Sequence, residues 1–226
     1  MYLNRVFYIG HFSQFEDLIL EVGKISCMKK GEPLLQEPSK EIMHYILSGV
    51  LMSYYVYENG KEKISGFFGR GQIVPYVACL PIDPEYIQPK MYLPSRCLND
   101  VSIVTFKRTE YMRLFDQNAG LRTAVYNWMV YRHDKYEYET FFLSNSSTYL
   151  KVCAFLYTNS DLFEVFRCEN LILTQDDLGS ILGESRVDVA RAYKKLRDQK
   201  IISTYRGGVK LLNRDKLADI LGHTDE

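Results

Sequence analysis

Two N-terminal capping boxes that lie eleven residues apart (185 − 174) constrain the fold of this chain more than any other feature. Thr174 is followed at the third helical position by Asp177, and Ser185 is followed in the same way by Asp188. In each pair the hydroxyl oxygen can accept from a free backbone amide at the start of the helix. The acid at the third position can in turn accept from the backbone amide of the capping residue. Gly183 ends the first helix, and two short helices joined by a tight turn with glycine are the helix-turn-helix pattern.

The segment after the second helix predicts a wing and carries an excess of positive charge. Residues 201–212 read as two short strands joined at Gly207–Gly208. Between Ser185 and Arg214 there are nine Lys or Arg residues against two Asp, a local net charge of +7 (9 − 2), although the whole chain has 28 basic and 28 acidic residues. We therefore expect a local nucleic-acid-binding surface, with the second helix in the major groove of DNA.

The first half of the chain predicts an antiparallel β-barrel or roll. Runs rich in β-branched and aromatic residues alternate with glycines between positions 25 and 106. Gly49, Gly60 and Gly71 recur at intervals of eleven (60 − 49 and 71 − 60), and Asn59–Gly60 is a strong hairpin signal. Prolines at 81, 84, 89 and 94 exclude a central strand there, so we expect an edge or a loop.

Between the two regions, residues 109–143 have helical periodicity, with a break near residues 116–120. The second helix carries a stripe with spacings of three and four, typical of a helix seam. We interpret it as a dimerisation seam, the alternative being a helix packed on its own domain. Its members are Leu121, Ala124, Trp128, Tyr131, Lys135, Tyr138 and Phe142.

Together these signals predict an α+β fold with three parts: a β-roll domain (1–108), a helical linker with a long dimerisation helix (109–143) and a winged helix-turn-helix domain (144–226). A composition of 46% hydrophobic and 25% charged residues is that of a globular protein. We expect a cytoplasmic protein, because the sequence shows neither a signal peptide nor a transmembrane run. We find no pattern of an enzyme or a metal site.

The order of β-roll, long helix and winged helix-turn-helix resembles the Crp/Fnr superfamily of bacterial transcription regulators. Residues 173–191 are similar to the DNA-binding signature of that family, and residues 45–49, 59–60 and 69–72 are similar to its β-roll turns. The resemblance implies a homodimer that binds double-stranded DNA, with a cyclic-nucleotide-binding-like, cupin-type roll. It also implies that the β-roll domain (1–108) is an effector-sensing domain. RNA polymerase is a further partner that it implies.

Matched onto this signature, Arg191 takes the position of an arginine that contacts guanine. Val187 stands where many relatives have a Glu that accepts from cytosine, so the familiar half-sites are not expected. The DNA-binding residues that the resemblance and the charge pattern imply are Thr174, Ser185, Arg186, Val187, Arg191, Lys194, Tyr205 and Arg206.

The resemblance does not extend to the cAMP-binding residues. Pro75–Tyr76 and Met91–Tyr92 replace the acidic ribose partner and the phosphate-binding pair, and Ser95–Arg96 would supply the latter only after realignment of the loop. A phosphodiester would then lack a compensating cation. The five cysteines do not form the cluster that an iron–sulfur regulator needs, and no haem ligand pair is evident, so no cofactor is expected.

An aromatic pocket with a cation remains as the candidate effector site. Its residues are Phe67, Phe68, Tyr76, Arg132 and Lys135. A weaker similarity to the halorespiration regulators, which sense chlorinated phenols through a lysine on the long helix, places that lysine at Arg132. We therefore expect an unidentified small-molecule effector, with an anionic aromatic compound as the sharper hypothesis.

Three alternatives stay open: a regulator without an effector, a redox-responsive regulator that uses Cys79 and Cys97, and a ligand-binding module without regulated DNA binding. The sequence does not decide between an activator and a repressor.

Overall fold

The computed structural model describes residues 6–34, 41–82, 93–168, 172–205 and 208–222, leaving out the side chains of residues 77, 138, 139, 143, 167 and 168. By its contacts the chain forms two compact units. One consists of Phe7–Glu58 and Ser65–Arg132, and the other of Val6, Asn59–Ile64 and the residues from His133 onward. The expected boundary at 108 lies at the start of a helix (Arg108–Gln117), and the one at 143 lies inside the long helix (Ala119–Asn145), which the contacts divide between Arg132 and His133.

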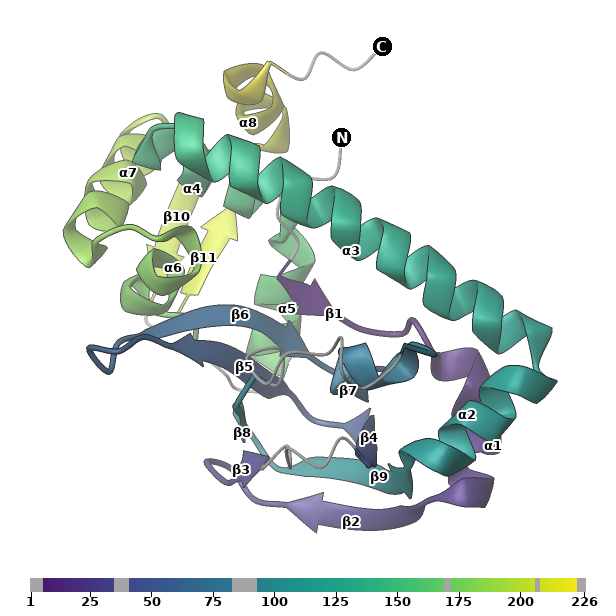
Figure 1. Cartoon of the computed structure of the whole chain (residues 1–226). Helices are drawn as coiled ribbons and strands as arrows, with labels where there is room; N and C mark the ends of the chain where they lie inside the picture. Colours follow the sequence, from purple (N-terminus) through teal and green to yellow (C-terminus); the bar gives the residue numbers. More distant parts are fainter. Residues whose placement is uncertain (1–5, 35–40, 83–92, 169–171, 206–207, 223–226) are drawn as a thin grey trace. The chain divides into compact units, whose positions relative to one another are not determined.

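The first unit contains the expected β-roll, built from two sheets (Figure 1). The five-stranded sheet has the order β1-β6-β5-β8-β3, and the four-stranded sheet has the order β2-β9-β4-β7. The strands are β1 (Phe7–Tyr8), β2 (Lys24–Met28), β3 (Pro33–Leu34), β4 (Ile42–Ser48), β5 (Leu51–Val56), β6 (Glu62–Phe68), β7 (Ile73–Val74), β8 (Ser95–Cys97) and β9 (Val101–Lys107).

The sequence predicts an antiparallel roll, but one pair of its strands is parallel. β1 pairs in parallel with β6, placing Phe7 opposite Phe67 and Tyr8 opposite Phe68. Two residues are too short to show a strand period, so this strand leaves no pattern in the sequence. The short helices η1 (Ser13–Phe15), α1 (Glu16–Val22) and η2 (Tyr76–Cys79) were not predicted either.

The three regularly spaced glycines lie in the turns where they were expected. Gly49, Gly60 and Gly71 have φ angles of +83°, +78° and +81°, in the left-handed region that favours glycine. At Gly49 a Cβ would also lie 2.4 Å from the carbonyl oxygen of Asp100. The prediction of a loop at prolines 84 and 89 falls outside the described residues.

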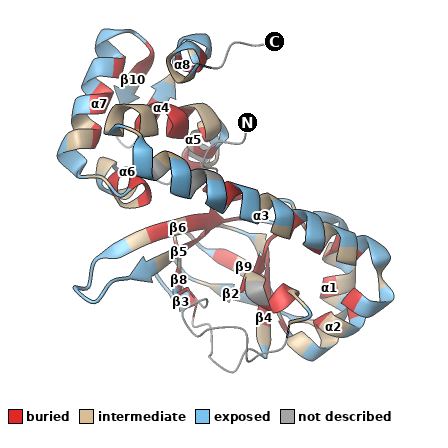
Figure 2. Ribbon diagram, turned by 45° about the horizontal axis from the view of Figure 1, so that its top comes forward, coloured by how far each residue is buried: buried red, intermediate tan, exposed pale blue. Residues whose placement is uncertain are grey.

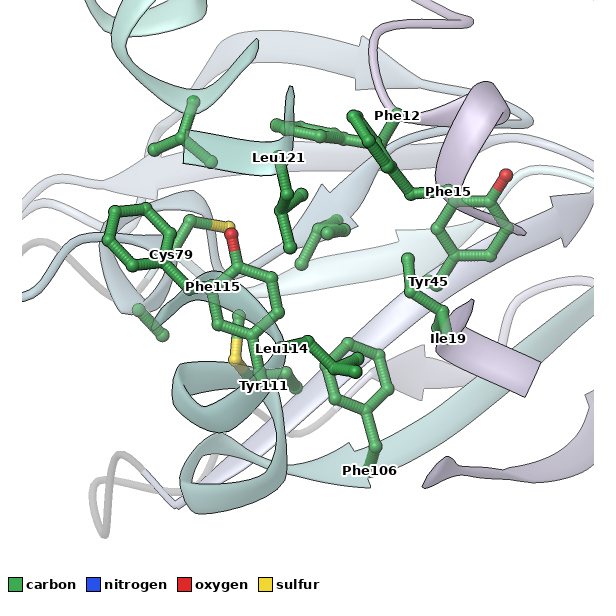
Figure 3. Close-up of a cluster of buried hydrophobic side chains, with 14 of the residues drawn as sticks. Phe12, Phe15, Ile19, Tyr45, Cys79, Phe106, Tyr111, Leu114, Phe115 and Leu121 are labelled. Carbon is green, nitrogen blue, oxygen red and sulfur yellow. The ribbon is translucent and has the colours of Figure 1, made fainter. Parts of the chain in front are cut away.

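The core of the roll unit is aromatic (Figure 3). Phe12, Phe15, Tyr45, Tyr111 and Phe115 are all buried in one cluster. The helix α2 (Arg108–Gln117) supplies Tyr111 and Phe115, and the break after it lies at Asn118, as predicted. These side chains explain why an aromatic-rich sequence forms this roll.

The long helix α3 (Ala119–Asn145) exists as predicted, but part of its stripe packs on the roll unit. Leu121, Val125 and Trp128 belong to the core cluster, and Leu121 and Trp128 are 0% and 2% exposed. Both residues are thus buried within their own unit, as in the alternative of a helix packed on its own domain, and their place in a dimer seam stays a prediction. Ala124 and Tyr131 are half-buried at the edge of the same cluster.

The second unit contains the helix-turn-helix and its wing. Its helices are α4 (Thr148–Thr158), α5 (Ser160–Cys168), α6 (Gln175–Leu182), α7 (Arg186–Asp198) and α8 (Arg214–Leu221). The strands β10 (Ile202–Tyr205) and β11 (Gly208–Leu211) pair antiparallel as the expected hairpin. Among the described helices, none is long and apolar enough to span a membrane.

Because His44 is buried, we expect the free energy of unfolding to fall as the pH is lowered. Burial lowers the pKa of His44 from 6.5 to about 4, and its Nδ1 lies 3.0 Å from the hydroxyl of Thr105. The unfolded chain therefore binds a proton near pH 6.5 that the folded chain binds only near pH 4. The contribution of His44 to the free energy of unfolding should therefore fall by roughly 3 kcal/mol as the pH drops from 6.5 to 4.

His44→Gln should flatten that part of the pH dependence in urea unfolding measured between pH 7 and pH 4. His133, which is exposed, supplies the control His133→Gln. Equal slopes in wild type and His44→Gln would contradict the assignment.

Candidate nucleic-acid interface

The first helix of the motif begins and ends as the sequence predicts. Thr174 caps α6: its Oγ1 accepts from the Asp177 amide at 3.1 Å, and the Asp177 carboxylate accepts from the Thr174 amide at 2.9 Å. At the other end, Gly183 is the C-cap with a φ of +70°. Thr174 is an exposed residue, and its hydroxyl also donates to the Asp177 carboxylate at 2.7 Å.

The turn between α6 and α7 packs directly against Gly179. The Glu184 amide donates to the Gly179 carbonyl at 2.9 Å. A Cβ at Gly179 would lie 2.7 Å from the Glu184 carbonyl oxygen. This close approach fixes where α7 starts, and Ser185 then caps it, with its Oγ 3.2 Å from the Asp188 amide.

The buried face of α7 determines which of its side chains meet solvent. Val189, Ala192, Tyr193 and Leu196 are buried. Val187, Arg191 and Lys194 are exposed at spacings of four and three, so helix periodicity places them on the face opposite the buried residues. Figure 2 shows that α7 has both buried and exposed residues. Val187 is 57% exposed, so its methyl groups are accessible on this face of α7.

Two of the exposed arginines have acidic neighbours. Arg191 donates to the Asp188 carboxylate at 2.8 Å, and Arg186 lies 3.7 Å from Asp176. The hydroxyl of Ser185, and after it Arg191, holds the pKa of Asp188 below its usual value. Asp188 therefore stays ionised and orients the guanidinium of Arg191 on the solvent side of α7.

On the wing, Tyr205 is 50% exposed and stands opposite Gly208 in the hairpin. A Cβ at Gly208 would lie 2.4 Å from the Tyr205 hydroxyl, so the glycine leaves room for the ring. Lys210 is also exposed on this hairpin. Arg206, the remaining predicted DNA contact, lies outside the described residues.

Within the roll unit, the structure gathers most of the predicted effector residues. The guanidinium carbon of Arg132 lies 4.1 Å from the ring centre of Tyr76, 5.1 Å from that of Tyr8 and 5.3 Å from that of Trp128. Phe68 stacks on Tyr8 with ring centres 5.2 Å apart. Arg132 is 2% exposed, so this cation–aromatic cluster is internal.

The structure does not place the other predicted effector residues among the contacts of Arg132 described above. Phe67 is 1% exposed, opposite Phe7 on β1. Lys135 is 4% exposed, with its Nζ 5.8 Å from the Tyr136 ring centre, and it belongs to the second unit by its contacts. Met91–Tyr92 lie outside the described residues. Ser95 is buried and hydrogen-bonded to Ser53, and Arg96 stacks on Tyr54 at 4.7 Å.

The thiols proposed as a redox pair are buried in two different hydrophobic clusters of the roll unit. Burial raises the pKa of Cys79 to about 12 and that of Cys97 to about 11, and neither is in a disulfide. Thiols with such pKa values are poor nucleophiles near neutral pH. The redox alternative therefore lacks structural support. Among the described residues, no group of three or more His, Cys, Asp or Glu is placed to hold a metal.

A groove of about 700 Å³ runs along the first half of α3. Beside His11 and Gln14, it is lined by α3 residues that include Ala124, Asn127 and Tyr131. Three members of the predicted seam, Ala124, Trp128 and Tyr131, thus line this groove. Phe142 is half-buried, and the side chain of Tyr138 is not described.

Sequence reasoning missed Glu184. Its carboxylate accepts from Thr148 at 2.8 Å and forms an ion pair with Lys151 at 2.5 Å. These partners lie more than thirty residues away in the chain, so no local spacing marks the residue.

Comparison with known protein families identifies a Crp-like helix-turn-helix domain over residues 151–220. The fumarate and nitrate reduction regulatory protein of Vibrio cholerae serotype O1 is 24% identical over 227 residues, covering 95% of this chain and 85% of that protein. Its counterpart in Escherichia coli K12 is also 24% identical, over 213 residues that cover 87% of this chain and 78% of that protein.

Solved structures share the fold at lower identity. A variant of CooA from Carboxydothermus hydrogenoformans has a TM-score of 0.71 at 13% identity, covering 91% of this chain and 90% of that chain. OCPA-complexed CprK has a TM-score of 0.69 at 14% identity, covering 94% and 98% of the two chains.

Because of the close approach at Gly179, we expect a glycine-to-alanine substitution in this helix to lower the stability of the domain. Glycine to alanine within a helix ordinarily stabilises by about 1 kcal/mol. Because the added Cβ would meet the Glu184 carbonyl, Gly179→Ala should instead destabilise the domain by about 1–3 kcal/mol in chemical denaturation. Gln175→Ala in the first turn of the same helix is the control, and a stabilised Gly179→Ala variant would refute the packing described here.

Proposed function

We propose that this chain, a member of the Crp/Fnr superfamily of DNA-binding transcription regulators, acts as a homodimer that reads DNA with α7 under the control of a small molecule. The observation that carries the DNA-reading role is the exposed stripe of Val187, Arg191 and Lys194 on the face of α7 opposite its buried residues. A helix that presents cationic side chains outward, after a capped N-terminus, suits the major groove.

Arg191 is proposed to read a guanine, since a guanidinium can donate to both O6 and N7 of that base. Its pairing with Asp188 supports this role, because the carboxylate holds the side chain in place before DNA arrives. Val187 can cover a thymine methyl group and cannot accept from cytosine. We therefore expect half-sites that differ from those read by a Glu at this position.

Phosphate contacts are assigned to the polar groups around this stripe. Thr174 and Ser185 lie at the starts of the two helices, where free amides also favour an anion. Arg186, Lys194 and Tyr205 are exposed, and Tyr205 places its ring on the wing. Contacts of this kind set affinity and register and carry little sequence information.

Dimerisation is proposed to use the groove side of α3. Gly120, Ala124 and Asn127 are small or short side chains that permit close approach of a second helix, and Tyr131 supplies an aromatic edge. The second copy of α3 would cover the groove while Leu121 and Trp128 continue to pack inside their own unit. Tyr138 and Phe142 extend the proposed seam toward the end of the helix.

The proposed effector is an anionic aromatic compound bound near Arg132. The cluster of Tyr8, Tyr76 and Trp128 around this guanidinium offers both a positive charge and ring faces. Phe67 and Phe68, which are buried in the same unit, remain part of the proposed site. A regulator that needs no effector is the alternative, in which this cation–aromatic cluster serves only as core.

Further parts of the proposal follow from family membership. We propose that the chain is not an enzyme, that it resides in the cytoplasm, and that it meets RNA polymerase at its promoters. The alternative of a ligand-binding module without regulated DNA binding is disfavoured by the exposed cationic stripe on α7.

The roles assigned to α7 predict two different mutant phenotypes. Arg191→Ala should cost about 1–3 kcal/mol against the preferred sequence and relax discrimination at one position. Lys194→Ala should weaken binding to all sequences equally and lower the salt dependence by about one unit. Fluorescence anisotropy on preferred and scrambled duplexes at several salt concentrations separates these effects. Unchanged discrimination in Arg191→Ala would mean that another face of α7 meets DNA.

The dimer proposal predicts that a charge in the groove separates the protomers. Tyr131→Glu and Ala124→Glu should each give a monomer in sedimentation velocity, because the carboxylate would be buried without a partner. Val130, which is 61% exposed and does not line the groove, supplies the control Val130→Glu. A dimer in both groove variants would place the interface elsewhere.

A further inference from the structure

The first turn of α4 contacts the residue that precedes the cap of α7 and the C-terminal end of α7. Thr148 and Lys151 hold Glu184, immediately before the cap of α7, and Tyr149 contacts residues at the end of that helix. We propose that this turn is a clamp that positions the reading helix, with Glu184 and Tyr149 as positioning residues that set the spacing between DNA half-sites. The inference rests on the proposed function, in which α7 reads DNA in a dimer.

At the start of α7, both carboxylate oxygens of Glu184 are engaged. Oε1 accepts from the Lys151 ammonium at 2.5 Å, and Oε2 accepts from the Thr148 hydroxyl at 2.8 Å. The Lys151 and Glu184 side chains are only 11% and 17% exposed, so solvent screens their attraction weakly. The carboxylate also lies beside the N-terminal turn of α4, where the helix dipole favours a negative charge.

The backbone of Glu184 is held from a second direction. Its amide donates to the Gly179 carbonyl, and its own carbonyl occupies the space where a Cβ at Gly179 would lie. The next residue, Ser185, caps α7. Glu184 is thus tied to α4 by its side chain, to α6 by its backbone and to α7 by its chain neighbour.

At the far end of α7, Tyr149 makes the matching contact. Its hydroxyl donates to the Gln199 side-chain oxygen at 2.8 Å, and the Lys195 ammonium lies 3.9 Å from its ring centre. Burial, and after it Cys153, raises the pKa of Tyr149 to about 12, so the hydroxyl keeps the proton that it donates. Contacts at two ends of one helix restrict its rotation as well as its translation.

The clamp adjoins the helix that the dimer is proposed to use. α3 ends at Asn145, and α4 begins at Thr148 after only two residues. Each α7 therefore takes its orientation from the turn that directly follows α3. In a two-fold dimer the two reading helices must lie about 34 Å apart to meet successive major grooves, so a loosened clamp should relax the preferred spacing.

The test compares DNA duplexes that carry two preferred half-sites at the preferred separation or with one or two base pairs inserted. The full-length wild type should discriminate between these duplexes. Glu184→Gln keeps the shape of the side chain and removes the charge, and it should reduce this spacing discrimination about fivefold, the size of a 1 kcal/mol coupling. Base preference within a half-site, which Arg191 sets, should stay unchanged.

Two further variants keep the test informative. Tyr149→Phe removes one hydroxyl at the other end of α7 and should reduce spacing discrimination about twofold, even if Glu184→Gln fails to fold. Glu164→Gln is the matched control, because Glu164 is an exposed residue of α5 in the same domain. It should bind all duplexes as the wild type does.

The results of this experiment distinguish a failure of the clamp from a failure of the proposed function. A wild type without spacing preference or dependence on Arg191 would overturn the proposed function and this inference with it. A wild type that shows both, beside folded Glu184→Gln and Tyr149→Phe variants that keep its spacing preference, would overturn the clamp alone. The same holds if Glu184→Gln weakens binding equally at every spacing, which is the effect of a merely structural contact.

Discussion

The burial of one face of α7 is the constraint on which the rest of the DNA-binding surface depends. Val189, Tyr193 and Leu196 pack inside the second unit, and their periodicity leaves Val187, Arg191 and Lys194 outside. The polar contacts then refine this arrangement: Ser185 starts the helix, Asp188 holds Arg191, and Glu184 ties the turn to α4. A basic stripe thus arises in a chain whose formal net charge is zero.

Features with short-range causes could be predicted from the sequence. The capping residues Thr174 and Ser185 and the turn glycines Gly49, Gly60 and Gly71 each satisfy a local backbone requirement, and the structure confirms all five. The long helix is predictable for the same reason, because the three- and four-residue spacing of its apolar side chains is visible within one continuous segment.

Features that depend on distant partners could not be predicted in this way. The spacing of Leu121 and Trp128 fits a dimer seam and a helix packed on its own domain equally well, and their burial against aromatic residues of distant elements is visible only in the structure. Glu184 is functional in our proposal through Thr148 and Lys151, which no local pattern connects to it. Arg132 was placed in the effector site only by resemblance, and its aromatic neighbours come from three separate segments.

The central claim is that a two-fold dimer presents two copies of α7 to DNA. Selection of bound sequences from a random pool of duplexes by the full-length protein tests it most directly. The account predicts enrichment of an inverted repeat with a guanine in each half and half-site centres about 10 base pairs, or a multiple of that, apart. Enrichment of a single asymmetric site, or no enrichment above the starting pool, would contradict it.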